Sequence, residues 1–289
     1  MNHEKEPQLD VNTDPEALLP ERLDDEEAKR LICQKVGIPE EEYWDYMNML
    51  GSETSEGLAP YPFKTPEALA RLLLELRDKI SDYDTILCDD TSGRLPALFL
   101  KKIMDKKHEE QGKDLVRLEF VAAGKQYSPL FGEIREFIRE KNKEENWQKV
   151  LVVTDHIFSG ESMRKLVDIL EEENIDFDIA SVTAYTKKHD ERYEHDPCND
   201  PKVLQKLYFG SSVNEDEAMA APFYHKPKYT GVTKDVGFGP TSAHAERIEE
   251  SLEERQQKIR NNEKTLGQKK KQARKGMKDL AEELYKLVE

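Results

Sequence analysis

The chain has 289 residues, of which 37% are hydrophobic and 36% are charged, and its formal net charge is −16. The length suits one large domain with appendages, and a charged fraction above the roughly 25% of average domains predicts solvated helical extensions. No run of about 18 apolar residues exists, which excludes an ordinary membrane-spanning helix. The N-terminus has no apolar core of the secretory type, and three distant cysteines predict a reducing, cytoplasmic setting.

Charge is distributed unevenly along the chain. Residues 1–60 hold 16 acidic and 5 basic side chains, a net of −11, whereas residues 255–278 hold 10 basic and 1 acidic, a net of +9. An acidic body repels a nucleic-acid backbone, so only the basic tail could attract one. Because no aromatic residues alternate with the lysines, a solvated helix face is the preferred interpretation, and nucleic-acid binding is not expected.

The N-terminal third is predicted to be helical after an unstructured start. Residues 1–13 are polar and show no periodicity, which is typical of disorder. A helix is expected over Asp24–Val36, and a second begins at Pro39 with apolar residues at helical spacing: Tyr43, Met47 and Leu50. The composition of residues 51–62 is that of a linker. Residues 1–60 are therefore assigned to an acidic helical segment.

Strands and helices alternate in the middle of the chain. Thr65 as N-cap and Pro66 at the first helical position begin a helix. Strands are then predicted at Thr85–Cys88, Val116–Ala122, Val150–Thr154 and Ile179–Tyr185, with helices between them at Leu95–Met104, Pro129–Lys141 and Met163–Leu170. Such alternation predicts right-handed βαβ units and a doubly wound parallel sheet flanked by helices, assigned to residues 61–235.

Residues 236–289 are predicted to form a long charged helix. A heptad stripe runs along it through Leu252, Ile259, Leu266, Ala273, Leu280 and Leu287. The second seam position is mostly polar, so the stripe is too narrow for a strong coiled coil. We expect the helix to lean on the body or on a second copy of the chain, which would give a homo-oligomer.

The segment VLVVTDHIFSGES, residues 150–162, has the strongest chemical signature. A buried strand ends at Thr154 and Asp155, and a helix is expected to begin at Ser162. Backbone amides and the hydroxyl of Ser159 would face the positive end of that helix, which favours anion binding. Gly160 allows a phosphate to approach the backbone. The alternative is an ordinary helix cap.

This segment resembles the phosphoribosyl-pyrophosphate motif of type I phosphoribosyltransferases, and the overall pattern resembles bacterial proteins of that superfamily with no assigned substrate. The likeness covers roughly residues 80–190. It implies that Phe158, Ser159, Gly160, Glu161 and Ser162 form the loop for the 5-phosphate, and that Thr154 and Asp155 occupy the acidic positions that hold the ribose hydroxyls.

A second stretch, DTILCDDTSGRLPALFL at residues 84–100, resembles the strand and pyrophosphate loop of that family. The resemblance implies that Ser92, Gly93, Arg94 and Lys125 contact pyrophosphate. Asp89 and Asp90 would bind Mg²⁺ through carboxylate and water, and the alternative is that they only end a strand.

Two departures from the family pattern leave the activity open. Thr154 replaces the first acid, and Phe158 stands where 6-oxopurine members carry the carboxylate that acts as a base. The enzyme hypothesis is transfer of a phosphoribosyl group to a nitrogenous acceptor. The alternatives are a module that senses phosphoribosyl pyrophosphate or a nucleotide without turnover, and a partner-binding protein with a vestigial site, because a fold alone does not decide function.

Three other sites fit the sequence less well. A phospho-acceptor receiver would use Asp89, Asp90, Asp155 and Lys187, but the insertion before Asp155 is too long. A haloacid dehalogenase is excluded because D-x-D is absent. His189, His195 and Cys198 do not have the spacing of a zinc site and are assigned to a solvated loop.

Overall fold

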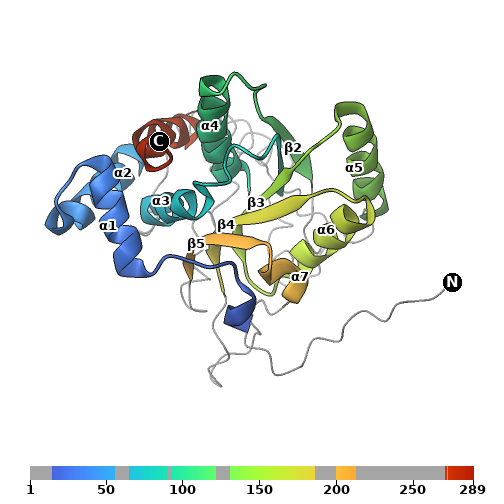
Figure 1. The fold of residues 1–289 in the computed structure, drawn as a ribbon, viewed down its shortest axis with the longest axis horizontal. Helices are drawn as coiled ribbons and strands as arrows, with labels where there is room; N and C mark the ends of the chain where they lie inside the picture. Colours follow the sequence, from blue (N-terminus) through green and yellow to red (C-terminus); the bar gives the residue numbers. More distant parts are fainter. Residues whose placement is uncertain are drawn as a thin grey trace, which may run out of the picture.

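A five-stranded parallel sheet forms the centre of the protein (Figure 1). The computed structural model describes residues 15–55, 65–89, 93–121, 131–185, 200–212, 271 and 273–289. The strand order is β2-β1-β3-β4-β5, and every neighbouring pair is parallel. The strands are β1 Thr85–Asp89, β2 Arg117–Val121, β3 Val150–Ile157, β4 Phe177–Ala184 and β5 Leu207–Ser212. The predicted α/β fold with a parallel sheet is therefore confirmed.

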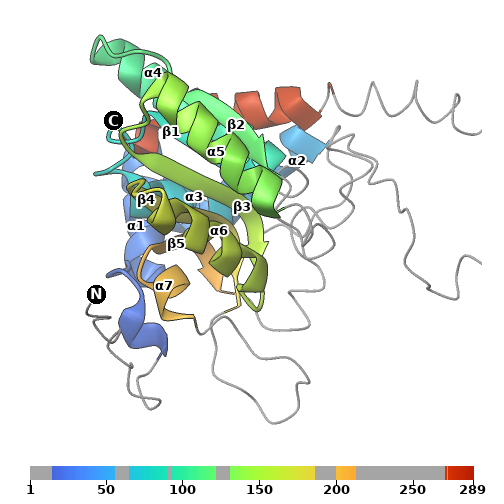
Figure 2. The same ribbon diagram turned by 90° about the vertical axis from the view of Figure 1, so that its right-hand side faces the viewer.

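Helices cover both faces of this sheet (Figures 1 and 2). One face carries α3 and α4, with α1 and α2 packed outside them, and the other carries α5, α6 and the short α7. Their bounds are α1 Asp25–Val36, α2 Tyr43–Ser55, α3 Thr65–Leu76, α4 Arg94–Glu110, α5 Phe131–Glu145, α6 Glu161–Glu172 and α7 Pro201–Leu204. Short 3-10 turns lie at Pro15–Leu18, Glu40–Glu42 and Tyr285–Leu287.

The central strand β3 shows why the sheet is buried on both sides. Leu151 and Val153 belong to the apolar cluster under α3 and α4, whereas Val150 and Val152 belong to the cluster under α5 and α6. All four side chains are 0% exposed. Apolar residues at consecutive positions are what a strand between two helical layers requires.

The structure extends several predicted elements and adds two. The predicted strands and helices are present with shifted ends, and α4 continues to Glu110 because its second half alternates buried residues with half-buried lysines. The strand β5 and the preceding α7 were not predicted. The expected linker is helical as far as Ser55, and residues 56–62 lie outside the described residues.

The described part of the C-terminal helix packs against the body of the same chain. Residues 273–284 are helical, and their apolar stripe joins the cluster under α1, α3 and α4. Lys102 of α4 pairs with Glu282 at 2.9 Å, and the Nζ of Lys107 donates to the carbonyl of Val288 at 3.0 Å. The stripe through Ala273, Leu280 and Leu287 is thus used within the monomer. The rest of the predicted helix, residues 236–270, lies outside the described residues.

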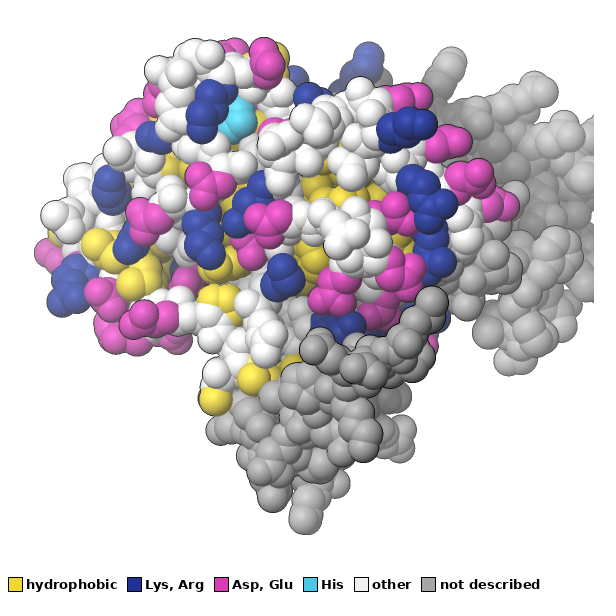
Figure 3. All heavy atoms as spheres, turned by 45° about the vertical axis from the view of Figure 1, so that its right-hand side comes forward, with side chains coloured by type: hydrophobic (Ala, Val, Ile, Leu, Met, Phe, Trp, Pro, Cys, Tyr) yellow, Lys and Arg dark blue, Asp and Glu magenta, His cyan; other side chains and the backbone are white. Residues whose placement is uncertain are grey.

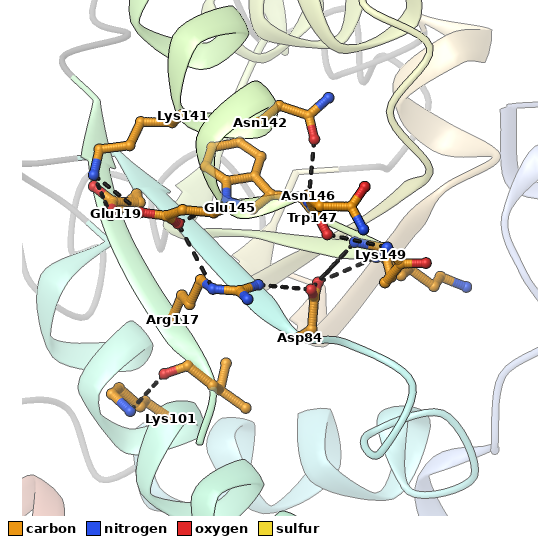
Figure 4. Close-up of polar contacts among 12 residues, drawn as sticks. Asp84, Lys101, Arg117, Glu119, Lys141, Asn142, Glu145, Asn146, Trp147 and Lys149 are labelled. Atoms are coloured by element: carbon orange, nitrogen blue, oxygen red, sulfur yellow. Dashed lines mark hydrogen bonds and ion pairs between the residues drawn. The ribbon is translucent and has the colours of Figure 1, made fainter. Parts of the chain in front are cut away.

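One carboxylate ties together the amino ends of three strands (Figure 4). Asp84, just before β1, accepts a hydrogen bond from Arg117 of β2 at 2.8 Å. It also accepts from the backbone amides of Gln148 and Lys149, which lead into β3, at 3.2 Å. This network fixes the amino edge of the sheet, opposite to the edge where the predicted loops lie.

None of the helices in the described part of the chain is both long enough and apolar enough to span a membrane.

Candidate functional site

The two predicted loops follow neighbouring strands of the sheet. From β1 the chain passes to β2 on one side, and from β3 it passes to β4 and β5 on the other, so the strand order reverses between β1 and β3. In open α/β sheets ligands bind outside the carboxyl ends of the strands at such a switch point. Cys88 of β1 is in register with Val153 of β3, and β3 continues to Ile157, so β3 extends beyond the end of its neighbour β1.

The loop after β3 has the backbone that an anion site needs. Gly160 caps α6 with φ 74° and ψ −4°, a left-handed conformation that favours glycine. The helix begins at Glu161, one residue earlier than predicted, and no side chain caps it. Its first amides have no partner within the helix, and Ser159 is exposed beside them. A helix start of this kind attracts phosphate or carboxylate.

The two residues predicted to hold the ribose are buried. Thr154 is 4% exposed and Asp155 is 1% exposed, both within β3. The hydroxyl of Thr183 on β4 donates to the backbone carbonyl of Asp155 at 3.4 Å. A sugar diol could therefore reach the Asp155 carboxylate only after the groups covering it move.

The residues that directly follow β3 and β4 bring two rings together beside the loop. Phe158 is stacked on Tyr185 with ring centroids 5.1 Å apart and planes 12° apart. His156 lies 6.2 Å from Phe158, and its Nδ1 is 2.9 Å from the Thr183 hydroxyl. Phe158 was predicted in the loop, whereas Tyr185 and Thr183 were not predicted as site residues. Their position beside the loop follows from the parallel register of β3 and β4.

The predicted pyrophosphate residues are only partly described. Gly93 caps α4 with φ −81°, and Arg94 is the first residue of that helix. The Arg94 guanidinium lies 4.8 Å from the ring centre of Phe120 on β2. Because β2 and β3 flank β1 on opposite sides, this orientation turns Arg94 away from the Ser159–Gly160 loop.

Several predicted site residues fall where the structure gives no side-chain description. Asp89 ends β1 in register with Val121, but its side chain is not among those described. The others lie outside the described residues: Asp90, Ser92, Lys125, Lys187, His189, His195 and Cys198. Within the described residues, no three His, Cys, Asp or Glu side chains are grouped closely enough to hold a metal ion. The predicted Mg²⁺ ligands are thus neither assembled nor separated by this structure.

Comparison of the chain with protein-family models, with curated proteins and with solved structures finds no match.

Proposed function

We propose that the chain binds a phosphorylated ribose, either phosphoribosyl pyrophosphate or ribose 5-phosphate, at residues 158–162. The observation that carries the proposal is the left-handed backbone of Gly160. It connects the buried strand β3 to α6, a 12-residue helix with no side-chain cap, at the switch point of the sheet. The amides of the first turn and the exposed Ser159 would bind the 5-phosphate.

The finer fold assignment is part of this proposal. A phosphoribosyltransferase-like core needs a parallel sheet in which a pyrophosphate loop and a phosphate loop follow neighbouring strands. The loops after β1 and β3 meet that requirement. Asp155 would hold the ribose once uncovered. Lys125 would contact pyrophosphate, and Arg94 would do so only after leaving the ring of Phe120. Asp89 with Asp90 has the oxygen ligands that Mg²⁺ prefers.

If the chain is an enzyme, it transfers the phosphoribosyl group to a nitrogenous acceptor. Catalysis would then rest on positioning and on electrostatic stabilisation of the departing pyrophosphate. Mg²⁺ bound with the substrate would supply positive charge to that leaving group.

The second candidate function is sensing of the same ligand without turnover. It is favoured by Phe158, an apolar ring in the position that carries a carboxylate base in part of the resembled family, and by the burial of Asp155. The two functions share the phosphate site and differ only in whether pyrophosphate is released.

Titration calorimetry on the full chain tests the phosphate site. Phosphoribosyl pyrophosphate with Mg²⁺, and ribose 5-phosphate alone, should bind the wild type, and the double variant Ser159→Ala with Ser162→Ala should weaken both by about tenfold or more. Ser81→Ala is the matched control because Ser81 lies before β1, at the opposite edge. Failure of the wild type to bind either compound would refute the proposal. If the wild type binds, release of pyrophosphate with candidate bases would identify an enzyme, and binding without release would identify a sensor.

A further inference from the structure

The sequence of the edge strand β5 has none of the features that keep an open strand from pairing with another chain. It pairs with β4 on one side only, and its sequence LYFGSS contains neither a charged residue nor a proline. The opposite edge strand β2 carries Arg117, which pairs with Asp84 at 2.8 Å, and Glu119, which pairs with Lys141 at 3.6 Å. Acidic and basic side chains are interspersed over the side of the molecule that carries α5 and β2 (Figure 3). Because charges on an edge strand disfavour pairing, β2 protects itself, whereas β5 depends on a neighbouring segment.

The backbone of β5 presents hydrogen-bonding groups away from the sheet at every second residue. The amide of Ile179 on β4 donates to the carbonyl of Lys206 at 2.7 Å, and Ile179 is in register with Leu207. In a parallel ladder this pattern points the N–H and C=O groups of Lys206, and of alternate residues after it, toward β4. The corresponding groups of Leu207, Phe209 and Ser211 then point outward, where an added strand would bind.

Residues 15–24, which we call the strap, cross this open side of β5 (Figure 1). The 3-10 turn of the strap packs against α7, and Leu19 lies against the apolar cluster on that face of the sheet, whereas Leu23 lies against the cluster on the other face. Between them Arg22 donates to the outward carbonyl of Phe209 at 2.8 Å, and its guanidinium lies 3.6 Å from the centre of the Phe209 ring. Among the described residues, no backbone hydrogen bond joins the strap to β5. Side chains therefore hold the strap in place, and strand pairing does not.

We propose that the strap keeps β5 from pairing with the β5 of a second copy of the chain, and that its displacement gives a two-fold dimer with one continuous sheet. In a two-fold arrangement each strand meets its own sequence in antiparallel orientation. Like charges placed opposite each other destabilise such a pair, and LYFGSS contains no charge. The inference does not depend on the proposed phosphate site, which follows β3.

Sedimentation velocity on the full chain tests the proposal. The wild type should be monomeric, and Leu19→Ser with Arg22→Ala should raise the association constant for dimerisation by about tenfold or more, since a hydrogen bond from a charged group contributes about that factor. Arg22→Ala alone is the milder variant and should shift the equilibrium in the same direction. Arg30→Ala with Leu115→Ser changes the same residue types at exposed positions, so this matched control should sediment like the wild type.

A further substitution locates the dimer interface. Ser211→Pro removes an amide that points away from β4 and leaves the ladder within the monomer intact, so adding it to the strap variant should restore the monomer. Hydrogen exchange gives an independent readout, because pairing should slow exchange at the amides of Phe209 and Ser211 in the dimeric strap variant.

Three outcomes would overturn the proposal. The first is a strap variant that is folded by circular dichroism and stays monomeric. The second is a dimer that persists with Ser211→Pro or leaves the two amides unprotected, because the contact would then lie elsewhere. The third is a wild type that already dimerises through β5, because the strap would then not cover the strand.

Discussion

The contact between α3 and β5 leaves no room for a side chain at position 210. A Cβ on Gly210 would lie 1.8 Å from the backbone oxygen of Ala68 and 2.5 Å from its carbonyl carbon. Carbon and oxygen normally stay about 3.3 Å apart even in their closest favourable contacts. Gly210→Ala must therefore separate the helix from the strand by roughly 1.5 Å. Rotation of a side chain cannot relieve the clash, because the opposing atoms belong to the backbone.

The cost of this movement follows from what α3 buries. Its inner face includes Leu69, Leu72 and Leu73, each 0% exposed. Overpacking a tight core costs about 1–3 kcal/mol, and a clash between backbones belongs at the upper end. Replacing glycine also restricts the unfolded chain, which returns about 0.4–1 kcal/mol. We expect Gly210→Ala to lower the free energy of unfolding by about 2 kcal/mol, or the melting temperature by about 4–8 °C.

Urea denaturation followed by circular dichroism measures this loss as a lower midpoint with an unchanged slope. Gly132→Ala on α5 is the matched control, because a Cβ there meets nothing within 4 Å. That variant should be as stable as the wild type or slightly more stable. A Gly210→Ala protein within about 0.5 kcal/mol of the wild type would refute the reasoning, since it would mean that α3 is not seated on β5 as described.

Three further perturbations test other parts of the structure. Gly160→Ala forces a Cβ into the left-handed region, so it should cost about 1 kcal/mol in urea denaturation and weaken phosphate binding in calorimetry; unchanged values for both would contradict the loop geometry. Leu280→Ala should lower stability by about 2–5 kcal/mol, because Leu280 is 1% exposed, and a melting temperature equal to that of the wild type would mean that this helix does not pack on the body. The indole N–H of Trp147 lowers the pKa of Glu145 below its ordinary 4.5, so the carboxylate stabilises the fold above that pH and the contribution is lost as pH falls through the lowered pKa. Glu145→Gln should therefore lose less stability than the wild type during acid titration below about pH 5, and parallel curves would show that the interaction has no net effect.

The sequence predicts best where one residue pattern has only one structural solution. Val150–Val153 are apolar at four consecutive positions, which only a strand covered on both faces explains, and they form the middle of β3. The helix start near Thr65 and Pro66 was also predicted, but Thr65 is the first residue of α3 and its hydroxyl has no hydrogen-bond partner among the described residues, so it does not act as the predicted N-cap. The strand β5 has no such signature. Its identity depends on pairing with β4 and on the close approach of α3 at Gly210, which are tertiary contacts.

The candidate site likewise has features that are determined locally and features that depend on tertiary contacts. The loop was predictable because a glycine between a strand and a helix has a local conformational reason, and Gly160 indeed has a positive φ. The stack of Phe158 on Tyr185 joins the residues that follow two strands, and its existence depends on the register of β3 with β4. The orientation of Arg94 over Phe120 could not be predicted, because it is a choice among rotamers that no sequence pattern determines.

The two edges of the sheet differ in a way that bears on function. At the amino edge Asp84 is saturated by Arg117 and two backbone amides, and Asp178 accepts from Tyr83 at 2.8 Å while Lys149 lies 3.0 Å away. Burial, reinforced by Asp178, raises the pKa of Tyr83, so its phenol stays a hydrogen-bond donor at any ordinary pH. These groups form hydrogen bonds and an ion pair with one another, and these interactions stabilise the fold.

At the carboxyl edge the chain instead places a left-handed glycine, an exposed serine beside an uncapped helix start, and a ring stack outside both apolar clusters. Ser159 is exposed, and Gly160 leaves α6 without the side-chain cap that a serine at that position would supply. Local cost without a packing benefit is expected where a ligand compensates for it. Substitutions at the amino edge should therefore change stability and leave ligand affinity intact, and substitutions at Ser159 or Phe158 should do the reverse.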